Sequence, residues 1–304
     1  MYSFRIISSY LLATRLPIGV GSISLQSVDS ETALLCTSQS QPNPIDNQHP
    51  TQITGTINGT YAIVPIPYAS ARAIVPSQYA ILRHAYESLI PRWPKDMYPA
   101  YYEGLLDHDV GVGPLKIGDF QRSSIRLPFI DRLGDGHTSF RYTGPVMLSP
   151  NNLVALVGAS VGNDIRAGTF KSACDAYADD GHGNTFLEGT GVGSSKVDVR
   201  GTFRVTSSKS YAFNVFKNMT NQPSFSSVGN LCDHYISLYN TSVTQGVYTP
   251  VKVQGSVYVR PPYSLEKTTL AASGYRMDLS FIETNNVRCE SLKGFSGTGS
   301  GDSG

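Results

Sequence analysis

Ionisable side chains interrupt several apolar segments of this sequence, and they are the first candidates for chemistry. Glu103 lies inside an aromatic and apolar run that extends from Tyr98 to Leu106. A carboxylate in such a strand lies either on the solvated face or in a buried site, where its pKa rises and it can transfer protons. Glu103 is therefore a candidate catalytic acid or base.

The densest ionisable cluster follows directly, as Asp107-His108-Asp109. If this segment is a strand, both aspartates face one side and His108 the other, so three metal ligands cannot converge without a bulge. We therefore interpret the cluster as the charged, exposed end of a strand. His108 and the nearby Tyr101 are kept as candidates for substrate binding.

Arg126 is the third candidate for substrate binding. It lies in a strand-like segment in which it alternates with Ile125 and Leu127. Alternation of this kind places Arg126 on the opposite face from its two neighbours. The pattern does not decide whether that face points into the interior of the protein or away from it.

Metal and thiol chemistry find little support in the sequence. No CxxC pair is present, so we expect no cysteine-based zinc site, and the cysteines are interpreted as buried thiols or as one or two disulfides. The four cysteines are Cys36, Cys174, Cys232 and Cys289. Cys232, Asp233 and His234 are consecutive on a predicted helix and cannot face one another. Without a Gly-rich phosphate loop or a metal-spaced set of histidines, we expect neither a metal nor a cofactor.

Composition limits the class of protein and its partners. The chain has 304 residues, 40% of them hydrophobic and 15% charged, with 29 Gly and 18 Pro, which is typical of a globular chain rich in turns. A formal net charge of +1 gives no reason to expect a nucleic-acid partner. No apolar stretch reaches the roughly 20 residues that span a bilayer, so no membrane partner is expected.

The compartment stays open. Residues 1–13 have the basic start and short apolar core of a signal peptide, although Arg15 interrupts the pattern. Glycosylation sequons begin at Asn58, Asn218 and Asn240. These features make secretion one alternative and the cytoplasm the other.

The elements that must position these side chains are mainly strands, because apolar residues alternate with polar ones over many short segments. The strand candidates are 61–65, 98–106, 123–129, 139–148, 153–158, 197–205, 211–216, 251–259 and 275–281. Three helices are predicted, over 69–75, 83–90 and 231–239. So many short strands need closure into a sandwich or barrel, and the fold class is mostly β with minor helix (α+β).

The chain divides into three parts by composition. Residues 1–55 form an N-terminal extension and a Pro-rich linker, residues 56–290 form one β-rich domain, and residues 291–304 form a Gly/Ser tail with almost nothing to bury.

Four blocks of the domain resemble the acetoacetate decarboxylase family in type and order. Residues 61–76 resemble its opening strand, short helix and Val-Pro turn, and residues 97–103 resemble the strand that carries an active-site glutamate. Residues 151–170 resemble the segment that presents the catalytic lysine, and residues 272–281 resemble the closing strand. The resemblance implies a closed antiparallel β-barrel around a small-molecule pocket. It also implies a homo-oligomer and an active-site role for Glu103.

The chemistry of that family requires a lysine whose amine is neutral, since the amine must attack a ketone to form an iminium. Desolvation and the positive charge of an adjacent lysine lower the pKa of this lysine in the family. An ungapped match of the family's strand to Leu153–Gly158 puts Arg166 in the place of the reactive lysine. Arginine keeps its proton and cannot form the iminium, but it can hold a carboxylate or enol oxygen. With an insertion in the loop, Lys171 takes the place instead.

The sequence therefore predicts an acetoacetate decarboxylase-like enzyme that acts on a small carbonyl or polyketide-like substrate, as in secondary metabolism. We expect a cofactor-independent lyase, cyclase or dehydratase that uses acid–base chemistry without a Schiff-base lysine, with Glu103 transferring protons and Arg166 binding an oxygen. Two alternatives stay open: a non-catalytic barrel that binds a small molecule, and a β-keto acid decarboxylase that uses Lys171.

Overall fold

A computed structural model describes residues 41–208 and 211–295 of the chain. The predicted N-terminal extension up to residue 40, its signal-peptide features and the Gly/Ser tail from residue 296 lie outside the described residues. The strands are β1 (Ile53–Pro67), β2 (Ala80–Ile81), β3 (Met97–Val112), β4 (Leu115–Lys116), β5 (Phe120–Asp131), β6 (Ser139–Leu148), β7 (Ile165–Lys171), β8 (Thr185–Gly191), β9 (Val199–Val205), β10 (Ser224–Phe225), β11 (Leu231–Leu238), β12 (Val251–Val259) and β13 (Thr268–Arg288).

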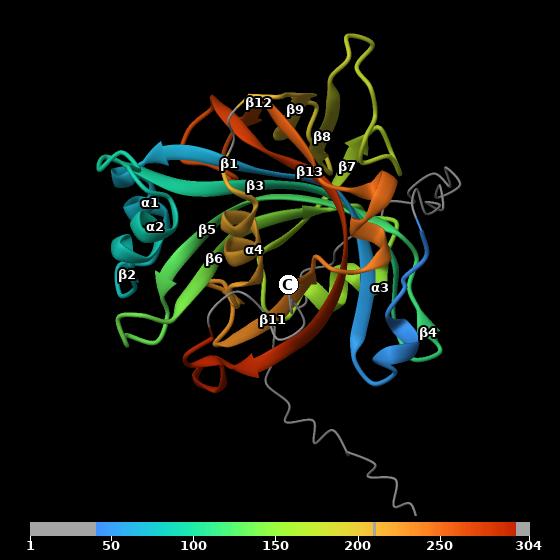
Figure 1. Cartoon of the computed structure of the whole chain (residues 1–304), viewed down its shortest axis with the longest axis horizontal. Helices are drawn as coiled ribbons and strands as arrows, with labels where there is room; N and C mark the ends of the chain where they lie inside the picture. Colours follow the sequence, from blue (N-terminus) through green and yellow to red (C-terminus); the bar gives the residue numbers. More distant parts are fainter. Residues whose placement is uncertain (1–40, 209–210, 296–304) are drawn as a thin grey trace, which may run out of the picture. The chain divides into compact units, whose positions relative to one another are not determined.

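These strands form one sheet that closes on itself. Going round the ring, β6 pairs with β5, β5 with β3, β3 with β1, β1 with β13, β13 with β11, and β11 returns to β6 through β10. A second path runs from β6 through β7, β8, β9 and β12 to β13 (Figure 1). Most pairings are antiparallel, but β6 pairs with β7 and with β10 in parallel. The prediction of a mostly β chain with minor helix is confirmed.

β13 is the longest strand, and it joins three neighbours. Its first half pairs with β12, its middle and second half pair with β1, and its last part also pairs with β11. A strand with three neighbours must bend. Gly274 lies where β13 approaches β1 closely, because a Cβ at this position would clash with the carbonyl oxygen of Tyr61 on β1. This bend brings the end of β13 round to β11, on the far side of the ring from β5.

In the part of the chain that the structure describes, four α-helices accompany the sheet: α1 (Tyr68–Ile74), α2 (Arg83–Leu89), α3 (Leu153–Ser160) and α4 (Phe213–Asn221). α1 and α2 confirm the first two predicted helices and lie together beside β2, at the ends of β1 and β3, whereas α3 lies toward the opposite end of these strands (Figure 1). No helix in the described part of the chain is long and apolar enough to cross a membrane.

Three element predictions were wrong. The segment 153–158, expected as a strand because of its valines, is helix α3, and the Asn152 side chain caps it by accepting a hydrogen bond from the Ala155 amide. The segment 211–216 contains the start of helix α4 rather than a strand. The segment 231–239, expected as a helix, is strand β11 because β10 and β13 satisfy its backbone on both sides.

The ends of the domain are attached to the sheet. Ile45 is buried against residues of β11 and β13, and Asn43 donates a 2.9 Å hydrogen bond to Thr54 of β1, so the predicted linker already packs against the sheet before residue 55. A disulfide joins Cys232, at the start of β11, to Cys289, just after β13. Cys174 is disulfide-bonded as well. Of the two interpretations for the cysteines, disulfides are therefore the one that holds for these three residues.

Candidate functional site

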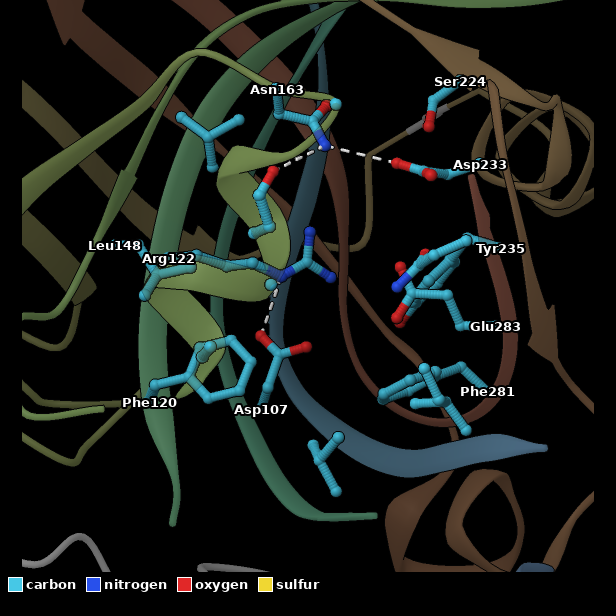
Figure 2. Close-up of a pocket in the computed structure, with 18 of the residues that line it drawn as sticks. Asp107, Phe120, Arg122, Leu148, Asn163, Ser224, Asp233, Tyr235, Phe281 and Glu283 are labelled. Atoms are coloured by element: carbon cyan, nitrogen blue, oxygen red, sulfur yellow. Dashed lines mark hydrogen bonds and ion pairs between the residues drawn. The ribbon is translucent and has the colours of Figure 1, made fainter. Parts of the chain in front are cut away.

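A cavity of about 280 Å³ lies within the ring. Its polar lining comes from the middle of β3, β5 and β6 on one side and from β11 and β13 on the other. In Figure 2, Arg122, Phe120 and Leu148 lie on one wall, and Tyr235, Phe281 and Glu283 lie on the wall opposite. The cavity therefore depends on the closure of the sheet, because strands far apart in the sequence form its two walls.

Glu103 and Arg126 both line the cavity and contact each other. The sequence predicted both residues as site candidates. Both side chains are buried, and Glu103 Oε1 accepts hydrogen bonds from Arg126 Nε at 2.7 Å and from Arg122 Nη1 at 3.1 Å. Ser124 Oγ donates to the same oxygen at 2.8 Å, and Arg126 Nη1 donates to Thr143 at 2.6 Å. One carboxylate oxygen thus holds two guanidinium groups in place.

This environment changes the role expected for Glu103. Burial alone would raise its pKa, but the positive charges of Arg126 and Arg122 outweigh burial and hold the pKa of Glu103 at about 2. The raised pKa that the sequence suggested is therefore wrong. A carboxylate that stays ionised and accepts this many hydrogen bonds orients the two arginines rather than exchanging protons with a ligand.

Asp107 is the second acid of this wall. It is buried, and its Oδ2 accepts a 2.8 Å hydrogen bond from Arg122 Nε. Burial raises the pKa of Asp107, and Arg122 opposes that shift. The interpretation of residues 107–109 as an exposed strand end was wrong, because β3 continues to Val112 and pairs with β1 along this stretch.

Arg141 differs from Arg122 and Arg126, because no carboxylate among the described residues is hydrogen-bonded to it. Its Nη1 donates a 3.0 Å hydrogen bond to the Tyr101 hydroxyl, and its Nε is buried without a partner in the described part of the chain. The guanidinium also lies 5.7 Å from the centre of the Tyr235 ring. Burial alone would lower the pKa of Arg141, but Tyr101 and then the Glu103 carboxylate raise it, so the guanidinium stays charged. A buried cation that faces a cavity and has no carboxylate hydrogen-bonded to it within the described residues is suited to bind an anion.

Glu283 faces these arginines from the opposite wall. It is partly buried at the cavity surface, and no hydrogen bond to its carboxyl group is present within the described residues. Burial, reinforced by the nearby Asp233 carboxylate, raises the pKa of Glu283 to about 7. Tyr235 is its cross-strand neighbour on β11, and the buried hydroxyl of Tyr235 has no hydrogen-bond partner among residues 41–208 and 211–295. Glu283 is thus the acid whose proton is exchangeable near neutral pH.

The structure does not bring the other predicted residues to this cavity. The Arg166 side chain is 53% exposed and forms a 2.7 Å ion pair with Asp164. Lys171 is exposed at the end of β7. His108 is buried, with its Nδ1 2.7 Å from Asp109 Oδ2, but it does not line the cavity. Tyr101 contributes through its hydrogen bond to Arg141.

Four residues of the site were missed: Arg122, Arg141, Tyr235 and Glu283. A signal for Arg122 was present, because Phe120, Arg122, Ser124 and Arg126 alternate along one strand and share one face. No comparable signal existed for Tyr235, since its segment was taken for a helix. Glu283 lay beyond the predicted end of its strand.

The site offers anion-binding groups rather than metal ligands. Within the described residues, no three His, Cys, Asp or Glu side chains gather in a group that could hold a metal ion. The guanidinium groups and the protonatable Glu283 together can bind a carboxylate or an enolate and exchange a proton with it.

Comparison with known proteins finds similarity to solved structures alone. No protein-family model and no curated protein matches the sequence. Among solved structures, the chain is similar to an acetoacetate decarboxylase-like enzyme from Sphingomonas wittichii, with 9% identity over 79% of this chain and 92% of that chain and a TM-score of 0.43. It is similar to acetoacetate decarboxylase from Legionella pneumophila, with 12% identity over 83% and 97% of the two chains and a TM-score of 0.45.

A third similar structure is the enduracididine biosynthesis enzyme MppR complexed with pyruvate, with 9% identity over 76% of this chain and 87% of that chain and a TM-score of 0.44. Two of these similar structures are named for the family that the sequence resembles. At such identities the likeness does not extend to individual residues, so function must be argued from the side chains of the cavity.

Proposed function

We propose that the cavity binds a small oxo acid and catalyses proton transfer at the carbon next to its carbonyl group. Arg141 binds the carboxylate, Arg122 stabilises the negative charge that develops on the carbonyl oxygen, and Glu283 removes the proton. The carbon–hydrogen electron pair moves into the enolate, and Glu283 carries the proton. Enolisation of this kind is a step shared by lyases, cyclases and dehydratases, and further chemistry depends on the substrate.

The observation that carries this proposal is the arrangement of Arg141 and Glu283. Arg141 keeps its charge in a buried place, yet within the described residues no carboxylate is hydrogen-bonded to it and its Nε has no partner, so an anion in the cavity would supply the interaction that it lacks. A carboxyl group with a pKa of about 7 is ionised in about half of the molecules at neutral pH, which suits it to accept and return a proton.

The absence of an iminium from this proposal rests on the lining of the cavity. Among the described residues that line it, none is a lysine. Incubation with acetoacetate followed by borohydride reduction should therefore leave no mass adduct on Lys171. An adduct on Lys171 would restore the alternative of decarboxylation through a Schiff base.

Hydrogen exchange tests the proposed reaction directly. In heavy water, the protein should accelerate exchange of the methylene hydrogens of acetoacetate, followed by nuclear magnetic resonance, and the Glu283→Gln variant should lose at least about 100-fold of that rate. A Glu283→Gln variant that exchanges as fast as the unmodified protein would remove Glu283 from the mechanism. A protein that binds acetoacetate without exchanging its hydrogens would support the non-catalytic binding alternative.

The pH dependence of binding provides a second test. Because Glu283 is neutral below a pH of about 7 and negative above it, the affinity for acetoacetate should fall as pH rises through that value, by up to about tenfold per pH unit. The exchange rate of the bound acid should rise over the same range, because the ionised form is the base. Calorimetric titrations from about pH 5.5 to about pH 8.5 span this change and measure the first effect. Glu283→Gln should give a flat affinity profile.

A further inference from the structure

The cavity changes from charged to apolar along its length. The registers of β3, β5 and β6 place Glu103, Arg126 and Arg141 toward one end of the cavity, because Glu103 pairs opposite Ser124 and Arg126 opposite Thr143. Further along the same strands, the lining residues are Val110 on β3, Phe120 on β5, and Val146 and Leu148 on β6. On this wall, a ligand that fills the whole cavity therefore meets charged groups at one end and apolar groups at the other.

The apolar end lies between apolar residues of two segments, β4 with the residue after it and helix α3. Leu115 of β4 and the neighbouring Ile117 line the cavity on one side, and Val154 and Ala155 of α3 line it on the other. Leu115 and Val154 are each 62% exposed to solvent. Burial of these exposed surfaces by a ligand would be favourable, whereas a small, fully polar acid could not reach them from the arginines.

We infer that the ligand is an amphipathic acid, with its carboxylate on Arg141 and an apolar chain that runs past Phe120 and Leu148 to Leu115 and Val154. This inference rests on the proposed function, since it uses the same anion site for the head group. It adds the substrate class: oxo acids with an alkyl or aryl tail of several carbons rather than acetoacetate itself.

A second copy of the protein could also cover exposed apolar residues, and the outer face of α3 carries Leu153 and Val157 in addition. Leu115 and Val154 differ from these two, because Leu115 lies on β4 rather than on α3, and both Leu115 and Val154 line the cavity as well as face solvent. A ligand tail that leaves the cavity contacts both of them at once, which is the reason for assigning them to the tail.

A chain-length series of unreactive acids tests the inference. Butanoate, hexanoate, octanoate and decanoate are titrated into the full-length protein by calorimetry, and each fully buried methylene should raise the affinity by about fourfold. Octanoate should therefore bind at least roughly tenfold more tightly than butanoate. Octylammonium, which has the same tail and the opposite charge, should bind more weakly than octanoate.

Variants of Leu115 and Val154, which form the rim of the apolar end, test the same inference in a second way. Leu115→Asp and Val154→Asp place a charge on the path of the tail and should reduce the octanoate-to-butanoate affinity ratio to about threefold or less. Both side chains are exposed, so the fold should be retained, and a thermal melt verifies this. Val247→Asp is the matched control, because Val247 is 91% exposed and does not line the cavity. It should leave the ratio unchanged.

The outcomes separate the two proposals. If butanoate binds through Arg141 but affinity does not increase with chain length, the amphipathic ligand is excluded and the oxo-acid function stands. If no carboxylate of the series binds, the proposed function fails and the inference with it. If affinity does not change with chain length and Leu115→Asp instead disrupts a dimer, the rim belongs to an interface with a second copy, and the inference is overturned.

Discussion

Replacing Arg141 with methionine should weaken octanoate binding by about 100-fold or more, measured by calorimetry at about pH 6.5. The expected loss is about 3 kcal/mol, the range typical of removing one partner from a buried, charge-assisted pair. Lysine at this position keeps the charge but loses the planar fork, so Arg141→Lys should fall between the two proteins. The site predicted from the sequence supplies the control: Arg166→Met, at an exposed arginine outside the cavity, should bind octanoate normally.

Arg141→Met should also leave the protein as stable as before, or more stable. Burial of the guanidinium costs free energy, which the hydrogen bond to Tyr101 and the attraction of Glu103 offset, and methionine fills a similar volume without either effect. Urea unfolding at neutral pH measures this effect. A large loss of stability would instead assign Arg141 a structural role, and an unaffected affinity in Arg141→Met with a lost affinity in Arg166→Met would restore the assignment made from the sequence.

Replacing Glu103 with glutamine should destabilise the fold by about 3 to 5 kcal/mol, because Arg122 and Arg126 would lose the carboxylate that they share. Urea denaturation with an unchanged m-value is the appropriate measurement. The matched control is Glu87→Gln on α2, which removes an exposed ion pair with Arg83 and should cost less than about 0.5 kcal/mol.

The sign of the pH effect follows from the lowered pKa of Glu103. Its pKa falls from an ordinary value of 4.5 to about 2 in the folded protein, so its ion pairs stabilise the fold above pH 4.5. This stabilisation should be lost as pH falls from about 4.5 towards 2, and Glu103→Gln should lack the loss. If Glu103→Gln keeps its stability but loses hydrogen exchange, Glu103 and not Glu283 is the catalytic group.

The fold was predictable where apolar and polar residues alternate strictly, because this alternation indicates a strand and the face that it buries. β9, β12 and the middle of β13 show regular alternation of apolar and polar residues, and all three are strands. α3 and β11 were not predictable, because apolar runs such as Leu153–Gly158 fit both a helix and a strand, and the difference lies in a cap at Asn152 and in strand partners distant in sequence.

The site was predictable in part for the same reason. Glu103 and Arg126 were found because a charge within an apolar strand is unusual, but their roles depend on Arg122, which supplies a second cation to the same oxygen. Glu283 acquires its raised pKa from burial and from Asp233, and Asp233 comes from another strand. Such a shift depends on side chains brought together by closure of the sheet.

The position of Glu283 near the end of β13 has a consequence for how the site forms during protein synthesis. Glu283 pairs opposite Ile53 of β1, a contact between residues near the two ends of the described chain. A growing chain can form the β3–β5–β6 wall with its arginines early, but the opposing wall exists only after β13 has left the ribosome and paired with β1. A ligand can therefore stabilise the finished fold, and it cannot assist the earlier intermediates that lead to it.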